Sequence, residues 1–134
     1  LPTVEERLAI TGQPGIRRVI QMSAAAQIAF VGLGALDDRA PLMLDGFVTR
    51  ADLDALIAAG AVGEITGWAY DGDGRLIEGL SNDRVASAPI PSRDSTLVIG
   101  TAAGPGKIPA LRGALSGGLI NGLITDLTTG QALL

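Results

Sequence analysis

The chain has 134 residues, of which 47% are hydrophobic and 18% charged, and its formal charge is −4. This composition supplies enough apolar surface for a folded core, which excludes disorder, and the length fits one domain or part of one. A chain this acidic offers no basic surface that would bind DNA.

The sequence contains neither cysteine nor histidine. Disulfides, thiol nucleophiles, zinc sites of cysteine and histidine, and serine–histidine–aspartate triads are therefore excluded. Any metal would have to bind oxygen ligands alone, and we expect neither a metal nor a cofactor. Chemistry at a site must use carboxylates, hydroxyls, backbone N–H groups, arginines or Lys107, which is the only lysine.

The first predicted elements are a helix and a buried strand. Apolar residues at helical spacing predict a helix over 15–26, and the run 27–33 is apolar on both faces, as in a buried parallel strand. Gly32-Leu33-Gly34 then breaks the strand. This triplet begins like a dinucleotide-binding fingerprint, but Asp37 stands where the third glycine belongs. A tight turn, or a turn facing another kind of ligand, is the better interpretation.

The middle of the chain predicts a capped helix and a hairpin. The helix begins at Thr49, with Asp52 as its reciprocal capping partner, and ends at Gly60. A strand is expected over 64–70, followed by a hairpin turn at 71–74. The aspartates of that turn resemble the start of a calcium loop, but the later EF-hand ligands are missing, which favours a plain turn.

The last third of the chain continues the alternation of strand and helix. Strands are expected over 95–100 and 119–125, and helices over 107–115 and from Asp126 onward. This order predicts an α/β fold, a mainly parallel sheet with helices on both faces. Because no signal peptide or membrane-spanning run is visible, we expect no membrane contact and a cytoplasmic location.

Open parallel sheets bind ligands beyond the carboxyl ends of their strands. The glycine-rich loop 101–106 is expected there, between a strand and a helix that begins at Lys107. The loop lacks the first glycine and the final hydroxyl residue of a Walker motif, which disfavours an NTPase. The N–H groups of Gly104 and Gly106, the helix dipole and the lysine charge would still make an anion site. The ordinary alternative is a solvated lysine at a helix start.

Four further residues are candidates for a binding site. Glu64 follows the glycine-rich run that ends at Gly63, and its carboxylate would accept hydrogen bonds from ligand hydroxyls. The alternative is a surface glutamate after a helix cap. Gly34 would let a ligand approach the backbone closely. Arg84 is a candidate second phosphate contact, or else a surface arginine.

Six glycine-rich or polar segments occur in a characteristic order: 28–34 (IAFVGLG), 60–67 (GAVGEITG), 70–74 (YDGDG), 82–84 (NDR), 100–107 (GTAAGPGK) and 121–126 (NGLITD), closed by 132–134 (ALL). Together they resemble the C-terminal effector-binding domain of the SorC/DeoR-type sugar-binding transcriptional regulators of bacteria. The resemblance implies a fold similar to sugar-phosphate isomerases, glucosamine-phosphate deaminases and CoA transferases. It also implies that the effector is a phosphorylated sugar.

The same resemblance implies a domain organisation. Residues 1–134 would form the later half of the effector-binding domain, so that the fold is incomplete on its N-terminal side. A separate helix-turn-helix domain would bind DNA, and the whole protein would be a homo-oligomer, a dimer or a tetramer.

Residue roles follow from the resemblance position by position. Lys107 and Gly104 match the loop lysine and glycine that meet the effector phosphate, and Arg84 matches the arginine of an Asn-x-Arg motif. Glu64 stands where the family usually has aspartate. An enzyme on the same fold, an isomerase or deaminase with Glu64 as base, is the alternative. The absence of histidine and the scarcity of acid–base groups favour a binding protein.

Overall fold

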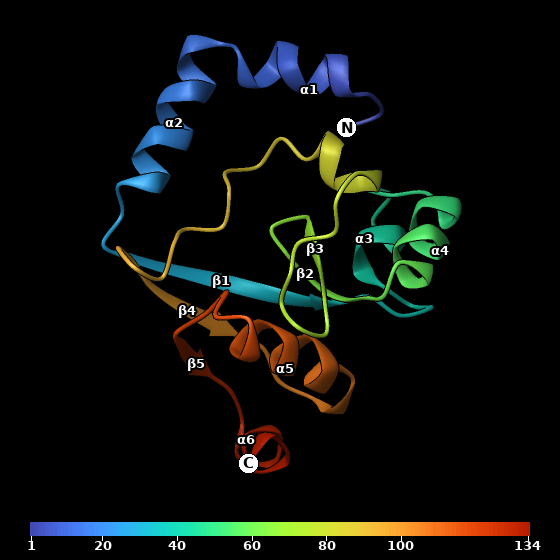
Figure 1. The fold of residues 1–134 in the computed structure, drawn as a ribbon, viewed down its shortest axis with the longest axis vertical. Helices are drawn as coiled ribbons and strands as arrows, with labels where there is room; N and C mark the ends of the chain where they lie inside the picture. Colours follow the sequence, from blue (N-terminus) through green and yellow to red (C-terminus); the bar gives the residue numbers. More distant parts are fainter.

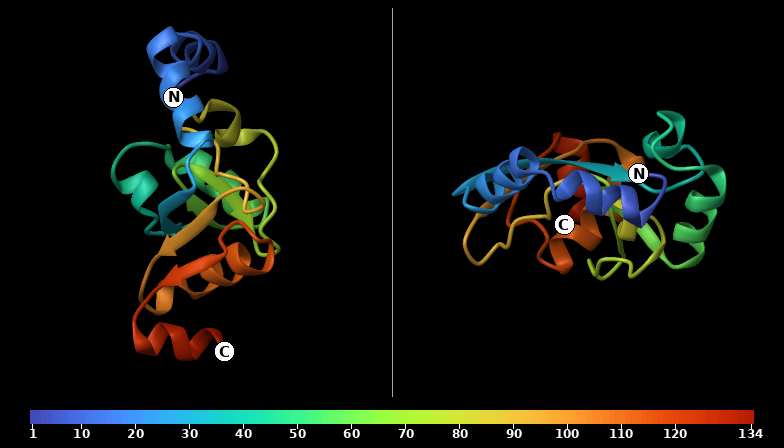
Figure 2. Two further views of the ribbon diagram at one scale, coloured as in Figure 1. Left: turned by 90° about the vertical axis from the view of Figure 1, so that its left-hand side faces the viewer. Right: turned by 90° about the horizontal axis from the view of Figure 1, so that it is seen from above.

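The computed structural model describes all residues from 1 to 134. Its elements in chain order are α1 (Val4–Thr11), α2 (Pro14–Ala24), β1 (Ile28–Ala35), α3 (Pro41–Leu44), α4 (Arg50–Ala58), β2 (Ala61–Ile65), β3 (Trp68–Asp71), the 3₁₀ helix η1 (Leu80–Arg84), β4 (Leu97–Thr101), the 3₁₀ helix η2 (Pro105–Lys107), α5 (Ile108–Ser116), β5 (Gly122–Ile124) and α6 (Leu127–Leu133). Helices α1 and α2 form an arm at one end of the elongated molecule, and α6 lies at the other end (Figures 1 and 2).

The strands form one sheet in the order β3-β2-β1-β4-β5. Strand β1 pairs in parallel with β4, and β4 pairs in parallel with β5. Strand β2 is antiparallel to both of its neighbours, so that four of the five strands point the same way. The predicted α/β fold with a mainly parallel sheet is thereby confirmed.

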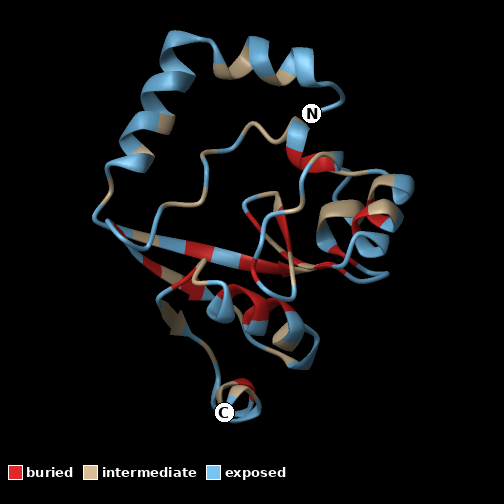
Figure 3. Cartoon of the chain, in the orientation of Figure 1, coloured by how far each residue is buried: buried red, intermediate tan, exposed pale blue.

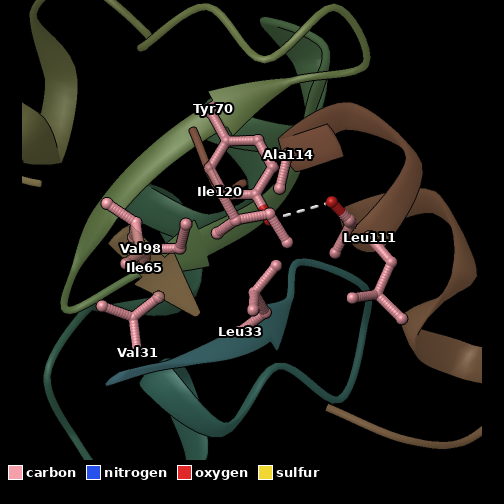
Figure 4. Close-up of a cluster of buried hydrophobic side chains, with 9 residues drawn as sticks. Val31, Leu33, Ile65, Tyr70, Val98, Leu111, Ala114 and Ile120 are labelled. Carbon is pink, nitrogen blue, oxygen red and sulfur yellow. Dashed lines mark hydrogen bonds between the residues drawn. The ribbon is translucent and has the colours of Figure 1, made fainter. Parts of the chain in front are cut away.

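Helices cover both faces of the sheet at its β2–β3 end. Helix α4 packs around Leu53 and Leu56 on one face, together with Ala69 of β3. Helix α5 packs on the other face around Tyr70, the largest fully buried side chain. Figure 4 shows Tyr70 in the middle of this cluster, with its hydroxyl donating to the Ala110 carbonyl oxygen at 3.0 Å. Burial, with the nearby Glu64 charge adding to it, raises the pKa of Tyr70 and keeps that donor protonated.

The β1–β4–β5 end of the sheet is covered on one face only. Its other face exposes four large apolar side chains: Ile28, Phe30, Leu97 and Ile124. Figure 3 shows the exposed patches along β1, and none of the residues of α2, which leads into β1, is buried. In addition, β2 pairs with β1 only over Leu33–Ala35, so the stretch Ile28–Gly32 has no strand neighbour on that edge. We call these side chains and this edge the open sheet face.

Several predicted local signals are confirmed. Thr49 and Asp52 form the reciprocal capping box of α4, and Gly60 follows the helix with a φ of +88°. The turn 71–74 is present, and within it the Asp71 carboxylate accepts hydrogen bonds from the N–H groups of residues 73 and 75. Gly74 then lies against α5 so closely that a Cβ would stand 2.4 Å from a helix carbonyl.

The expected single strand over 64–70 is wrong. The chain turns back at Thr66 and Gly67, whose φ angles are +51° and +92°, so that β2 and β3 form a hairpin. A β-branched threonine seldom takes a positive φ, which is why this run reads as one strand in the sequence. The expected break at Gly32-Leu33-Gly34 is also wrong, because β1 continues to Ala35 through its pairing with β2. Helices α1 and α3 were not predicted. None of the helices has both the length and the apolar composition needed to cross a bilayer.

Candidate functional site

A cavity of about 850 Å³ lies at the carboxyl ends of β1 and β4. Its walls come from the end of β1, the α3 region, the β2–β3 turn, η1 with the segment after it, and the end of β4. The lining residues are Leu1, Gly32, Leu33, Gly34, Pro41, Leu42, Phe47, Val48, Glu64, Thr66, Gly67, Ser81, Arg84, Val85, Ala86, Ser87, Thr101, Ala102 and Lys107. This is the edge of the sheet at which open α/β folds bind their ligands.

Lys107 reaches into this cavity from the start of α5. Its Nζ donates a hydrogen bond of 2.9 Å to the Leu33 carbonyl oxygen at the end of β1. Strand β4 pairs with β1 only as far as Thr101, so that Leu33 pairs with Ile65 of β2 but has no partner on the β4 side. The bond holds the ammonium group on the cavity wall, where an anion could draw it away from a single neutral acceptor.

Glu64 lies on β2 directly opposite Gly34 of β1. One carboxylate oxygen, Oε2, accepts a hydrogen bond of 2.8 Å from the Gly67 N–H. The other, Oε1, lies only 2.0 Å from the position that a Cβ on Gly34 would take. Glycine at position 34 therefore makes room for the carboxylate, which leaves Oε1 as an acceptor for a ligand hydroxyl.

Arg84 ends the short helix η1, and a buried asparagine fixes that helix in place. Asn82 accepts from the Ala69 N–H at 2.8 Å and donates to the carbonyl oxygens of Ala69 and Ile77. These bonds tie η1 to the edge of β3 and set Arg84 at the cavity wall. Its Nη2 donates to an Asp52 carboxylate oxygen at 2.5 Å.

Three of the expected site residues do not line the cavity. Gly63 faces α5, where a Cβ would lie 2.6 Å from both the Ala110 Cβ and the Tyr70 hydroxyl oxygen, so the glycine serves core packing. The Gly104 N–H donates to the Thr129 hydroxyl at 2.8 Å, which occupies a donor expected to face phosphate. Gly106 is exposed on η2 and is absent from the cavity wall.

The structure therefore brings Lys107, Glu64, Gly34 and Arg84 together around one cavity. Two cations and one carboxylate can meet a ligand that carries both a negative group and hydroxyls. Sequence reasoning missed Thr66 of the β2–β3 turn, because that turn was itself missed, and Ser87, which no motif marks. No group of three or more acidic side chains lies close enough together to hold a metal ion.

The comparisons with known proteins identify the family of the chain. A family model described as "Putative sugar-binding domain" matches residues 1–134. The chain is 30% identical over 132 residues to the erythritol catabolism regulatory protein EryD of Brucella abortus (strain 2308), covering 98% of the chain and 42% of EryD. The chain thus spans about two fifths of the length of this relative.

Two solved structures share the fold over nearly the whole chain. The full-length sorbitol operon regulator SorC from Klebsiella pneumoniae matches with a TM-score of 0.88 and 26% identity, over 100% of this chain and 44% of SorC. A domain of a possible sugar-binding transcriptional regulator from Arthrobacter aurescens TC1 matches with a TM-score of 0.87 and 26% identity, over 99% of this chain and 51% of that one. SorC is described as the regulator of the sorbitol operon, and the Arthrobacter chain as a domain of a possible sugar-binding regulator.

Proposed function

Because the chain belongs to the family of sugar-binding domains found in SorC/DeoR-type transcriptional regulators, we propose that it senses a phosphorylated sugar for such a regulator. The observation that carries the proposal is that Lys107 and Glu64 both lie on the wall of one cavity of about 850 Å³. A phosphosugar has a dianionic group for the ammonium and hydroxyl donors for the carboxylate. A cavity of this volume is of the size that holds small-molecule ligands.

The proposed contacts use groups that are partly free in the structure. The Lys107 ammonium exchanges the Leu33 carbonyl for the ligand phosphate, and Arg84 supplies a second cation. Glu64 keeps its bond to the Gly67 N–H and offers Oε1 to a sugar hydroxyl. We expect Gly63, Gly104 and Gly106 to contribute through packing and loop shape instead of direct contact.

Regulation would work by a population shift. The sugar would bind one arrangement of the subunits more tightly than the other, which would change how separate helix-turn-helix domains meet the operator. The acidic chain itself would not contact DNA. We propose a homo-oligomer, a dimer or a tetramer, because two half-sites on DNA require at least two subunits. Since transcription takes place at the DNA, we place the regulator in the cytoplasm.

An isomerase or deaminase on the same fold is less well supported. Glu64 is the only acidic residue on the cavity wall, and one of its oxygens already accepts from a backbone N–H. The relatives described above are named as regulators. Incubation with pentose and hexose phosphates, followed by analysis of the products, distinguishes the two functions, because turnover would favour the enzyme.

Thermal-shift titration tests the proposed binding directly. Pentose, hexose and polyol phosphates should raise the melting temperature, whereas the matching unphosphorylated sugars at the same concentrations should have a much smaller effect. The difference arises because the phosphate meets two cations that a neutral sugar cannot engage. Equal stabilisation by both series, or by neither, would contradict a phosphosugar sensor.

We also propose that the chain is the later half of a larger sugar-binding domain. The open sheet face supports this, because uncovered apolar strands with an unpaired edge are normally buried by further polypeptide. The Arthrobacter domain, of which the chain covers 51%, has about as many residues again. Those residues would cover the β1–β4–β5 face.

The substitution Phe30→Asp tests the open sheet face. Phe30 is 66% exposed, so the 134-residue chain should keep its melting temperature and bind less of a dye such as ANS that reports exposed apolar surface. Val31→Asp is the matched control, because Val31 is 7% exposed on the opposite face and its replacement should unfold the chain. A large loss of stability in the Phe30 variant would show that the face is covered.

A further inference from the structure

An ion pair behind the cavity connects Arg84 to helix α4. Arg84 Nη2 and Asp52 Oδ1 are 2.5 Å apart, and the two side chains are 24% and 23% exposed. The other ion pairs of the chain, such as Arg50 with Asp54, lie in solvent with both partners more than half exposed. Partial burial makes the Arg84–Asp52 pair the one whose geometry is held by the fold rather than by two mobile side chains.

The guanidinium of Arg84 retains donors after this bond is made. Nη1 lies 3.4 Å from the carbonyl oxygens of Leu1 and Pro2, which is the long end of the hydrogen-bond range. No hydrogen bond involves Nε. Asp52 therefore holds Nη2, while Nε and Nη1, which makes only the two long bonds, keep donors that a ligand can take.

Asp52 is itself fixed at its other oxygen. Oδ2 accepts from the Thr49 N–H at 3.0 Å and from the Thr49 hydroxyl at 2.8 Å, which completes the capping box of α4. Burial opposes ionisation of Asp52, but the bonds from Thr49 and Arg84 outweigh it and lower its pKa. The carboxylate is thus charged and immobile, as an anchor for another side chain must be.

We propose that Asp52 is a positioning residue for the ligand site: it holds Arg84 at the cavity wall so that the free donors of the guanidinium meet the ligand phosphate. This inference rests on the proposed function. An arginine fixed before binding does not lose its side-chain freedom when the ligand arrives, and the planar group is already oriented for a phosphate.

A positioning role for Asp52 and a purely electrostatic effect of its charge predict opposite changes in phosphate affinity when the carboxylate is neutralised. A negative charge near the site repels an anion, so removal of the charge alone would strengthen phosphate binding. Removal of an anchor would weaken it, because Arg84 would become mobile. We expect Asp52→Asn to weaken binding of inorganic phosphate about 3- to 10-fold, measured by isothermal titration calorimetry.

Two matched variants separate the other roles of the carboxylate. Asp54→Asn removes the same charge from the same helix, but its partner Arg50 is exposed and outside the cavity, so binding should stay unchanged or strengthen slightly. Thr49→Ala removes the capping hydroxyl but keeps the Thr49 N–H bond to Asp52 Oδ2 and the Arg84–Asp52 pair, so the melting temperature should fall while phosphate affinity falls much less than in Asp52→Asn. Asp52→Glu should restore part of the affinity lost in the asparagine variant.

A double-mutant cycle provides the deciding measurement. In an Arg84→Ala background, Asp52→Asn should cause no further loss of phosphate affinity, because no guanidinium remains to be positioned. Unchanged or stronger binding by the single Asp52→Asn variant would overturn the inference, as would an equal loss in both backgrounds. If the unmodified chain binds no phosphosugar at all, the proposed function fails and not merely the role of Asp52.

Discussion

Replacement of Lys107 by alanine should weaken phosphosugar binding about 10- to 100-fold, because a charge-assisted hydrogen bond to phosphate contributes about 1.5–3 kcal/mol. The same variant should lose a similar factor for inorganic phosphate, since the lost partner is the anion. In a complete regulator we expect the response to effector to disappear while operator binding persists. Calorimetric titration of the chain and a reporter assay for the regulator measure these two outcomes.

The structural cost of this substitution should be small. The bond from Nζ to the Leu33 carbonyl is one partly buried contact, with a net contribution of about 1 kcal/mol to stability. Arg112→Ala is the matched control, because Arg112 lies on α5, the helix that follows Lys107 directly, carries the same charge and donates only to the Ala132 carbonyl away from the cavity. Normal effector response in the Lys107 variant, or equal losses in both, would remove Lys107 from the site.

Local signals predicted most elements but not how they pair. The cap at Thr49, the glycine stop at Gly60 and three of the four predicted strands depend on short stretches of sequence, and the structure contains each of them. The fourth predicted strand, over 64–70, is a hairpin instead. The reversal at Thr66 escaped prediction because its positive φ is unfavourable locally and is imposed by the pairing of β2 with β1 and β3. Pairing of distant strands is a tertiary property that periodicity does not report.

The residues of the site were likewise predictable where their role is local, and not where it depends on a distant contact. Lys107 and Glu64 were visible as charges beside glycines at strand ends, and the cavity contains both. Asp52 was visible only as a helix cap, because its contact with Arg84 spans 32 residues of sequence. Gly104 looked like a phosphate-binding glycine until the fold placed Thr129 against its N–H. A side chain's local role can be read from sequence, whereas its second partner depends on packing.

Gly34 and Gly63 provide the sharpest test of that distinction. They stand on adjacent strands, β1 and β2, where Gly34 is paired with Glu64 and Gly63 is paired with Ala35. Alanine at position 63 would place its Cβ 2.6 Å from the Ala110 Cβ and the Tyr70 hydroxyl oxygen, inside a rigid core. We expect Gly63→Ala to cost about 1–3 kcal/mol and to lower the melting temperature by roughly 3–12 °C, as followed by circular dichroism.

Alanine at position 34 should have the opposite outcome. The three atoms nearest to its Cβ would all belong to the Glu64 side chain, whose flexible end can turn away, so the melting temperature should change little. Displacement of the carboxylate should then weaken phosphosugar binding about 10-fold or more and leave inorganic phosphate binding intact, since phosphate makes no use of Glu64. Equal losses for both ligands in Gly34→Ala would mean that Glu64 does not contact the sugar. A stable Gly63→Ala variant with impaired binding would instead return Gly63 to the ligand site.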